Sequence, residues 1–159
     1  MFFAKNSKRL IEAVKENDET RVKTLIERKA NINEADEQGW TSLHYAAMGD
    51  NFAIAKLLIE AGAEINARDK SGRTPLLLIA QTGYLATCQL LINSGANLEI
   101  KDNNGETALI KAVTFKRYDL MDALLAAGAN INAQDKNGLT ALMRVVQAGP
   151  INIVQSLLK

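Results

Sequence analysis

The sequence is poor in the residue types that most often build catalytic or metal sites. Its 159 residues include one cysteine, Cys88, and one histidine, His44. A single cysteine excludes an intrachain disulfide and a zinc site with several cysteines. A single histidine is also weak evidence for a catalytic site, because a catalytic base needs a nucleophile or an orienting group beside it. We therefore expect no metal and no other cofactor, and a protein that is not an enzyme.

A charge excess of one sign and long apolar runs are missing too. The chain has 19 basic and 18 acidic residues, whereas a nucleic-acid-binding domain is usually strongly basic. No window approaches the roughly 20 uncharged apolar residues of a membrane span, and the N-terminal segment lacks the apolar core of a signal peptide. These features predict a partner that is neither nucleic acid nor membrane. With so little cysteine they also fit a reducing compartment, and we expect the cytoplasm.

Short motifs for phosphate, nucleotide or calcium binding are absent as well. The sequence has no P-loop, no dinucleotide fingerprint, no nucleophile elbow and no Asp-rich loop of the EF-hand type. The glycines do not gather in one loop that would hold a phosphate. They are instead spread evenly along the chain, which is typical of an internal repeat.

What the chain does contain is a repeat of 33 residues. Four positions of the repeat hold the same residue in successive units, and we call each such set a column. The columns are Gly39, Gly72, Gly105 and Gly138; Thr41, Thr74, Thr107 and Thr140; Leu43, Leu76, Leu109 and Leu142; and Asp36, Asp69, Asp102 and Asp135. A further column, Leu25, Leu58, Leu91, Leu124 and Leu157, runs through five units. Units of this kind cannot bury their apolar face alone, so they are stable only when stacked.

Each unit is predicted to be a tight turn followed by two short helices. A threonine such as Thr74 suits the start of a helix because its hydroxyl caps free N–H groups. Apolar residues such as Leu43 and Ala47 then recur on one helical face. Gly62 follows the leucine-rich second helix, where a left-handed residue ends a helix at little cost. The Asn-Gly pair at 104–105 favours a tight turn.

These features resemble the ankyrin-repeat family, whose pattern is G-x-T-P-L-H-x-A-A, a helix ending in L-L, and G-A-x-x-N. Here the pattern reads GWTSLHYAA at 39–47 and LLIEAGAEINA at 57–67, and GRTPLLLIA, GETALIKAV and GLTALMRVV begin the later units. The resemblance covers the chain from about residue 5 to 159. It implies an all-α repeat solenoid of stacked helix-turn-helix units with β-turn hairpins. We expect one domain over 1–159, with an N-terminal cap repeat at 5–35, internal repeats at 36–68, 69–101 and 102–134, and a truncated repeat at 135–159.

The resemblance also implies a function. In this family the hairpin tips and the exposed side of the inner helices, the first helix of each unit, form a concave face that binds other proteins. We expect a non-catalytic protein–protein interaction module or scaffold, with a regulatory or inhibitory subunit of an enzyme as the alternative and a stand-alone enzyme as a third reading. Basic residues outnumber acidic ones on the hairpin side, so a mildly acidic protein or peptide would be complementary. The expected contact residues are Trp40, Met48, Lys70, Arg73, Gln81, Glu106, Phe115 and Leu139.

Two aromatic residues stand out among these candidates. Trp40 lies at a hairpin tip and Phe115 on an inner helix, where the core pattern does not require them. Exposed aromatic residues on a rigid surface often anchor a protein interface. The other reading is that Trp40 packs on its neighbouring hairpin and Phe115 on Tyr118.

Three further residues depart from the repeat. His44 stands at the histidine of the TPLH motif, and the resemblance implies that it joins hairpin to helix through a hydrogen bond and binds no metal. Cys88 shares a column with Ala55, which predicts a place in the core. Lys116 stands where the inner helix usually ends in glycine, so the turn at 116–117 is predicted to be strained or locally mobile.

The last unit stays apolar at Ile151, Val154 and Leu157. Terminal repeats normally carry a polar outer face. We therefore expect these three side chains to be partly exposed, or buried against a second copy, and a protein that is either a monomer or weakly associated through its C-terminal repeat.

Overall fold

The computed structural model describes residues 2–148, 150, 153–154 and 157. Its helices come in pairs, which are α1 (Phe2–Lys15) and α2 (Glu19–Glu27), α3 (Ser42–Met48) and α4 (Phe52–Glu60), α5 (Pro75–Thr82) and α6 (Leu85–Asn93), α7 (Ala108–Thr114) and α8 (Tyr118–Ala126), followed by α9 (Ala141–Ala148). Among the described residues the extended structure is one isolated antiparallel bridge between Ala35 and Thr41. The prediction of an all-α solenoid of helix pairs is confirmed.

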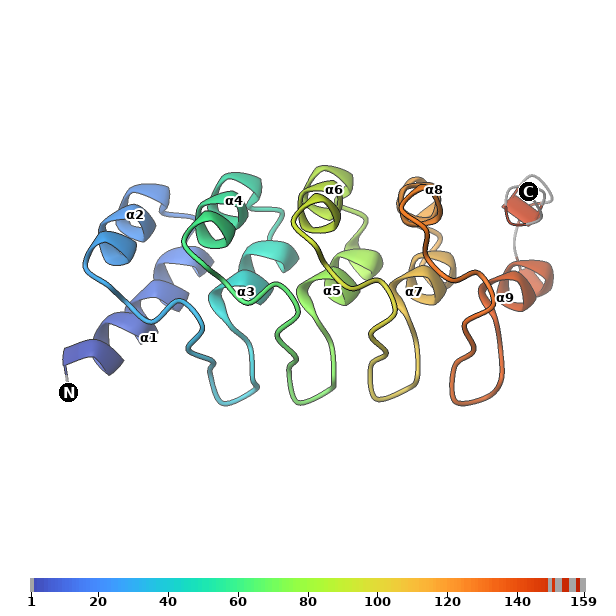
Figure 1. Ribbon diagram of the computed structural model, residues 1–159, viewed down its shortest axis with the longest axis horizontal. Helices are drawn as coiled ribbons and strands as arrows, with labels where there is room; N and C mark the ends of the chain where they lie inside the picture. The colour runs from blue at the N-terminus through green and yellow to red at the C-terminus, as the bar shows by residue number, and fades with distance from the viewer. Residues whose placement is uncertain (1, 149, 151–152, 155–156, 158–159) are drawn as a thin grey trace.

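The helices form two layers (Figure 1). The inner helices α1, α3, α5, α7 and α9 lie side by side in one layer, and the outer helices α2, α4, α6 and α8 lie in the other. The hairpins project in a row from the inner layer (Figure 1). Each helix pair therefore contacts the pairs before and after it, and the molecule extends in one direction.

The core lies between the two layers and between successive pairs. The leucine column of the outer helices is buried throughout, at Leu25, Leu58, Leu91, Leu124 and Leu157. Cys88 is also fully buried, as its column predicts, and this burial raises the pKa of its thiol to about 11. The thiol therefore stays protonated and behaves as a small apolar group.

Backbone hydrogen bonds join each hairpin to the next. The amide of Lys70 donates to the carbonyl oxygen of Gln38 at 3.0 Å, and Asn103 and Ser71 make the equivalent bond at 2.9 Å. Gly39 allows this close approach, because a Cβ atom there would lie 3.1 Å from the backbone of Asp69 and its φ of +82° disfavours other residues. The hairpins thus form a continuous row that can position side chains from neighbouring units.

The turn after α7 is left-handed, as predicted. Lys116 has φ of +58°, and Asn17 and Asp50 hold the same place in earlier units with φ of +54° and +53°. Gly83 occupies that place after α5 with φ of +99°. Lysine adopts this conformation less readily than asparagine, aspartate or glycine. The junction between α7 and α8 therefore carries local backbone strain.

Candidate protein-binding surface

Trp40 lies on the hairpin side, but it is tied into the structure. Its side chain is half-buried, and its indole Nε1 donates to Oδ2 of Asp69 in the next unit at 3.0 Å. The ring lies 4.9 Å from the ring of Tyr45, and the guanidinium of Arg73 sits 5.5 Å from its centroid. Trp40 therefore packs on its neighbouring hairpin, which was the other reading of this residue.

Three of the expected contact residues meet in one hollow. Trp40, Lys70 and Arg73 line a depression of about 300 Å³ between the first two hairpins. Arg73 is held by two bonds to Oδ2 of Asp69, from Nε at 2.8 Å and from its NH2 group at 2.7 Å. Burial acts to raise the pKa of Asp69, but the hydrogen bonds and charge of Arg73 outweigh it and hold this pKa below its ordinary value. Lys70 is exposed.

The turn aspartates all use their two oxygens in the same way. Oδ1 accepts backbone N–H groups inside the hairpin, as at Asp102 from Asn104 and Glu106 at 2.9 and 3.0 Å. Oδ2 then binds a side chain that differs from unit to unit. The partners are Tyr45 for Asp36, Arg73 and Trp40 for Asp69, Lys111 for Asp102, and Arg144 for Asp135.

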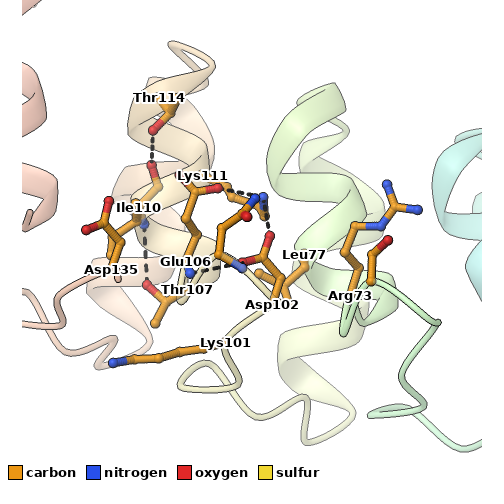
Figure 2. A network of polar contacts seen from close by, with 12 residues as sticks. Arg73, Leu77, Lys101, Asp102, Glu106, Thr107, Ile110, Lys111, Thr114 and Asp135 are labelled. Atoms are coloured by element: carbon orange, nitrogen blue, oxygen red, sulfur yellow. Dashed lines mark hydrogen bonds and ion pairs between the residues drawn. The ribbon is translucent and has the colours of Figure 1, made fainter. Parts of the chain in front are cut away.

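Lys111 is the least exposed of the three cationic partners of these aspartates. Its Nζ lies 2.7 Å from Oδ2 of Asp102 and 2.8 Å from Oε2 of Glu106, and only 4% of its side chain is exposed. Figure 2 shows the ammonium group between the two carboxylates. The second oxygen of Glu106 binds Arg144 at 2.8 Å, and Arg144 also binds Asp135. This ionic network joins α7 to α9 and its hairpin.

The network changes the interpretation of Glu106. Its carboxylate oxygens are bound by Lys111 and Arg144, and the residue is buried. It therefore presents no free carboxylate to a partner, and its position favours a structural role. The sequence held one signal for this network: Lys111 shares a column with Tyr45, Leu78 and Arg144, so a charged residue stands where Leu78 is fully buried.

The remaining candidates lie on the inner helices or at the last hairpin. Met48 is the last residue of α3 and Phe115 directly follows α7, and their side chains are exposed by 42% and 44%. Gln81 and Leu139 are half-buried. Since Trp40 precedes α3 and Phe115 follows α7, the tryptophan lies at the hairpin end of the inner layer and the phenylalanine at the opposite end. The candidates thus form two groups, one at each end of the inner helices.

His44 makes the tie that the resemblance implies. It is fully buried, its Nδ1 accepts the backbone N–H of Thr41 at 3.1 Å, and its Nε2 lies 3.1 Å from the carbonyl oxygen of Arg73. Because Nδ1 accepts a hydrogen bond, the proton sits on Nε2 and points to Arg73. Burial lowers the pKa of His44 below its ordinary value of 6.5. The neutral ring therefore joins one helix to the next hairpin.

Replacing His44 with alanine is expected to reduce the free energy of unfolding by about 1–2 kcal/mol, because Thr41 and Arg73 lose their partner. The folded chain binds the histidine proton more weakly than the unfolded chain does. This contribution is therefore complete above pH 6.5 and declines as the pH falls from 6.5 towards the folded pKa. Denaturant unfolding between pH 7.5 and pH 5 checks this. An identical pH slope in His44→Ala, or stoichiometric zinc bound through His44, would contradict the assignment.

The C-terminal expectation is only partly met. Leu157 is buried within the chain, which is a correction, because the outer-helix leucine column continues to this residue. Val154 is half-buried, and Ile151 lies outside the described residues. The exposed apolar residues are instead Met143 at 47% and Val146 at 65%, both on α9.

Among the described residues, no group of three or more His, Cys, Asp or Glu side chains is arranged to hold a metal ion. None of the helices in this part of the chain has the length and apolar character needed to cross a membrane.

Comparison with protein families agrees with the geometry. A family model described as "Ankyrin repeats (3 copies)" matches residues 61–135 and 100–159, and one described as "Ankyrin repeats (many copies)" matches residues 10–59. No curated protein matches the chain. Together the family matches cover nearly all of the sequence and coincide with the stacked helix pairs. The chain therefore belongs to the ankyrin-repeat family.

Proposed function

We propose that this protein is a non-catalytic interaction module of the cytoplasm that binds a protein or peptide on its concave face. Ankyrin repeats are generally protein–protein interaction modules. The observation that carries the choice of face is the exposure of Met48 and Phe115 at 42% and 44% on the inner-helix side. Large apolar side chains left exposed on a rigid surface are typical anchors of an interface.

The charged residues on the hairpin side determine which charge on a partner would be favoured. Arg68, Lys70, Lys101 and Lys136 are exposed there, against the exposed acid Glu37. Arg73 contributes less, because Asp69 neutralises it. A mildly acidic partner would be attracted to this edge and oriented on it, mainly through its association rate.

Capture of the partner from the native source tests the proposal. Immobilised chain is expected to retain one protein, and the double variant Met48→Glu/Phe115→Glu is expected to lose it. Lys56→Glu is the matched control, because Lys56 is an exposed residue of the outer helix α4. Loss of the partner with Lys56→Glu but not with the double variant would contradict the choice of face. The identity of the protein also distinguishes a scaffold from a regulatory or inhibitory subunit, since in the second case the partner is an enzyme.

We further propose weak self-association through the last repeat. Met143 and Val146 are exposed on α9, whereas the same two columns are buried in earlier units, at Ile110 and Val113 in α7. Charged substitutions at exposed apolar contacts disfavour association. The double variant Met143→Glu/Val146→Glu is therefore expected to be more monomeric than the original chain in sedimentation velocity across a concentration series. A chain that is monomeric at every concentration before substitution would disprove this.

A further inference from the structure

The segments that join inner to outer helices lie at one edge of the stack. They are residues 15–19, 48–52, 81–85 and 114–118, and they recur with the 33-residue step between α1 and α2, α3 and α4, α5 and α6, and α7 and α8. We call them the junction segments. They lie at the end of the inner helices that is remote from the hairpins, since each hairpin precedes its inner helix.

Exposed apolar side chains concentrate on these segments. Of the described residues, six large hydrophobic side chains are exposed, and four of them lie here. These four, which we call the junction row, are Met48, Phe52, Leu85 and Phe115, with exposures of 42%, 43%, 36% and 44%. Three successive units thus contribute at least one apolar side chain each. No described hairpin residue belongs to the exposed apolar group.

Formal charge changes steadily along the same segments. Residues 15–19 carry Lys15, Glu16, Asp18 and Glu19, for a net charge of −2. Residues 48–52 carry Asp50 alone, for −1, and residues 81–85 carry no charge. Residues 114–118 carry Lys116 and Arg117, for +2. Arg21 pairs with Glu16 and Lys23 pairs with Glu19, so the acids of the first unit are largely neutralised. The net charge of the edge therefore lies mainly at the basic fourth unit.

The basic end includes a place for a ligand side chain. A hollow of about 290 Å³ lies there, lined by Thr82, Gly83, Lys116, Arg117, Tyr118 and the Asp119–Leu120 pair. The Nε of Arg117 donates to the carbonyl oxygen of Gln81 at 2.9 Å, which fixes this side chain across two units. Lys116 and Arg117 are both exposed. A carboxylate entering from solvent would meet two cations and one acid.

The spacing of the units selects the shape of the ligand. Packed neighbouring helices lie about 8–10 Å apart, and two turns of an α-helix advance about 10.8 Å. A helix laid across the junction segments therefore places residues seven apart over successive units. An extended chain advances about 3.3 Å per residue, so it covers one unit in three residues and turns successive anchors to opposite sides. The repeat spacing matches a helix and not a strand.

We infer that the junction row binds an amphipathic α-helix of a partner protein. The apolar side chains of this ligand helix recur every seven residues, and its C-terminal part is acidic and faces Lys116 and Arg117. This direction also sets the negative end of the helix dipole against the basic junction segment. The inference rests on the proposed protein-binding function and names the kind of segment that is bound.

A displayed library of helix-forming peptides tests this directly. The peptides have 20 residues, about 30 Å as a helix, with randomised positions in a background of alanine and glutamine, and they are selected against the full chain. The enriched sequences are expected to carry apolar residues at seven-residue steps and aspartate or glutamate near the C-terminus. An enriched peptide is expected to bind Leu85→Glu at least about tenfold more weakly than the original chain.

The control is Gln89→Glu, an equally charged change on the exposed side of the same helix α6, which should leave affinity unchanged. The inference is overturned if no peptide is enriched, if the enriched sequences lack the seven-residue step, or if Leu85→Glu and Gln89→Glu bind equally. Leu85 is not among the residues changed in the partner-capture experiment. A failed selection together with a partner lost by Met48→Glu/Phe115→Glu therefore refutes the helix while the proposed function stands.

Discussion

Replacing Lys111 with alanine is expected to lower the free energy of unfolding by about 3–5 kcal/mol. The variant removes the one ammonium group between Asp102 and Glu106, whose side chains are 4% and 12% exposed. Two buried carboxylates then face each other without their shared cation, and Glu106 keeps only its contact with Arg144. Denaturant unfolding followed by circular dichroism measures the loss. A change below about 1 kcal/mol, the range of exposed ion pairs, would show that the network adds little.

A second variant separates the loss of charge pairing from the loss of side-chain volume. In the preceding unit, Arg73 forms an ion pair with the equivalent aspartate, Asp69, and the fully buried Leu78 stands in the column of Lys111. The double change Glu106→Arg/Lys111→Leu copies that arrangement into the fourth unit. It gives Asp102 a new cationic partner and removes the buried carboxylate of Glu106. The double variant is expected to recover most of the stability that Lys111→Ala loses, whereas Lys111→Leu alone should not.

Replacing Phe115 with alanine is expected to weaken partner binding by more than about 2 kcal/mol, roughly thirtyfold in affinity. Its exposed ring contributes to an interface only when a partner covers it, so the stability of the free chain should change little. Isothermal titration with the captured partner measures the affinity, and thermal unfolding measures the stability. Lys56→Ala, which removes an exposed residue of α4, should leave both values unchanged.

Trp40→Ala, unlike Phe115→Ala, is expected to reduce the stability of the free chain. This variant loses the indole bond to Asp69 and the contacts with Tyr45 and Arg73. We expect a loss of stability of about 1–2 kcal/mol in addition to any loss of binding. Unchanged stability in Trp40→Ala would mean that the hairpin contacts of the tryptophan contribute nothing in solution.

The repeat architecture follows from the sequence because each structural role recurs at one position of the period. Gly39 and its equivalents mark the hairpins, and the leucine column of the outer helices marks the core. His44 was interpreted correctly from its place in the TPLH motif of the family, and Cys88 from its column. In each case the residue type at one position of the repeat was enough to indicate its structural role.

The ionic network was not predicted, because its partners come from different units and different columns. Glu106 looked like a surface residue of the hairpin, and only the fold brings it to Lys111 and Arg144. Trp40 was ambiguous for the same reason, since its bond to Asp69 crosses from one hairpin to the next. The residues that recur at one position of the repeat indicate the role of that position within a unit. They do not indicate which side chains of different units contact each other.

The most direct test of the account is to map the bound face by photo-crosslinking. A photoreactive phenylalanine analogue is placed at position 48 or 115 on the inner-helix side, and at position 56 or 60 on the exposed side of α4. Each chain is irradiated with the captured partner, and the covalent products are separated and counted. Binding on the inner-helix side predicts cross-links from positions 48 and 115 and almost none from positions 56 and 60. Cross-links mainly from positions 56 and 60 would contradict it, because the partner would then lie on the outer helices.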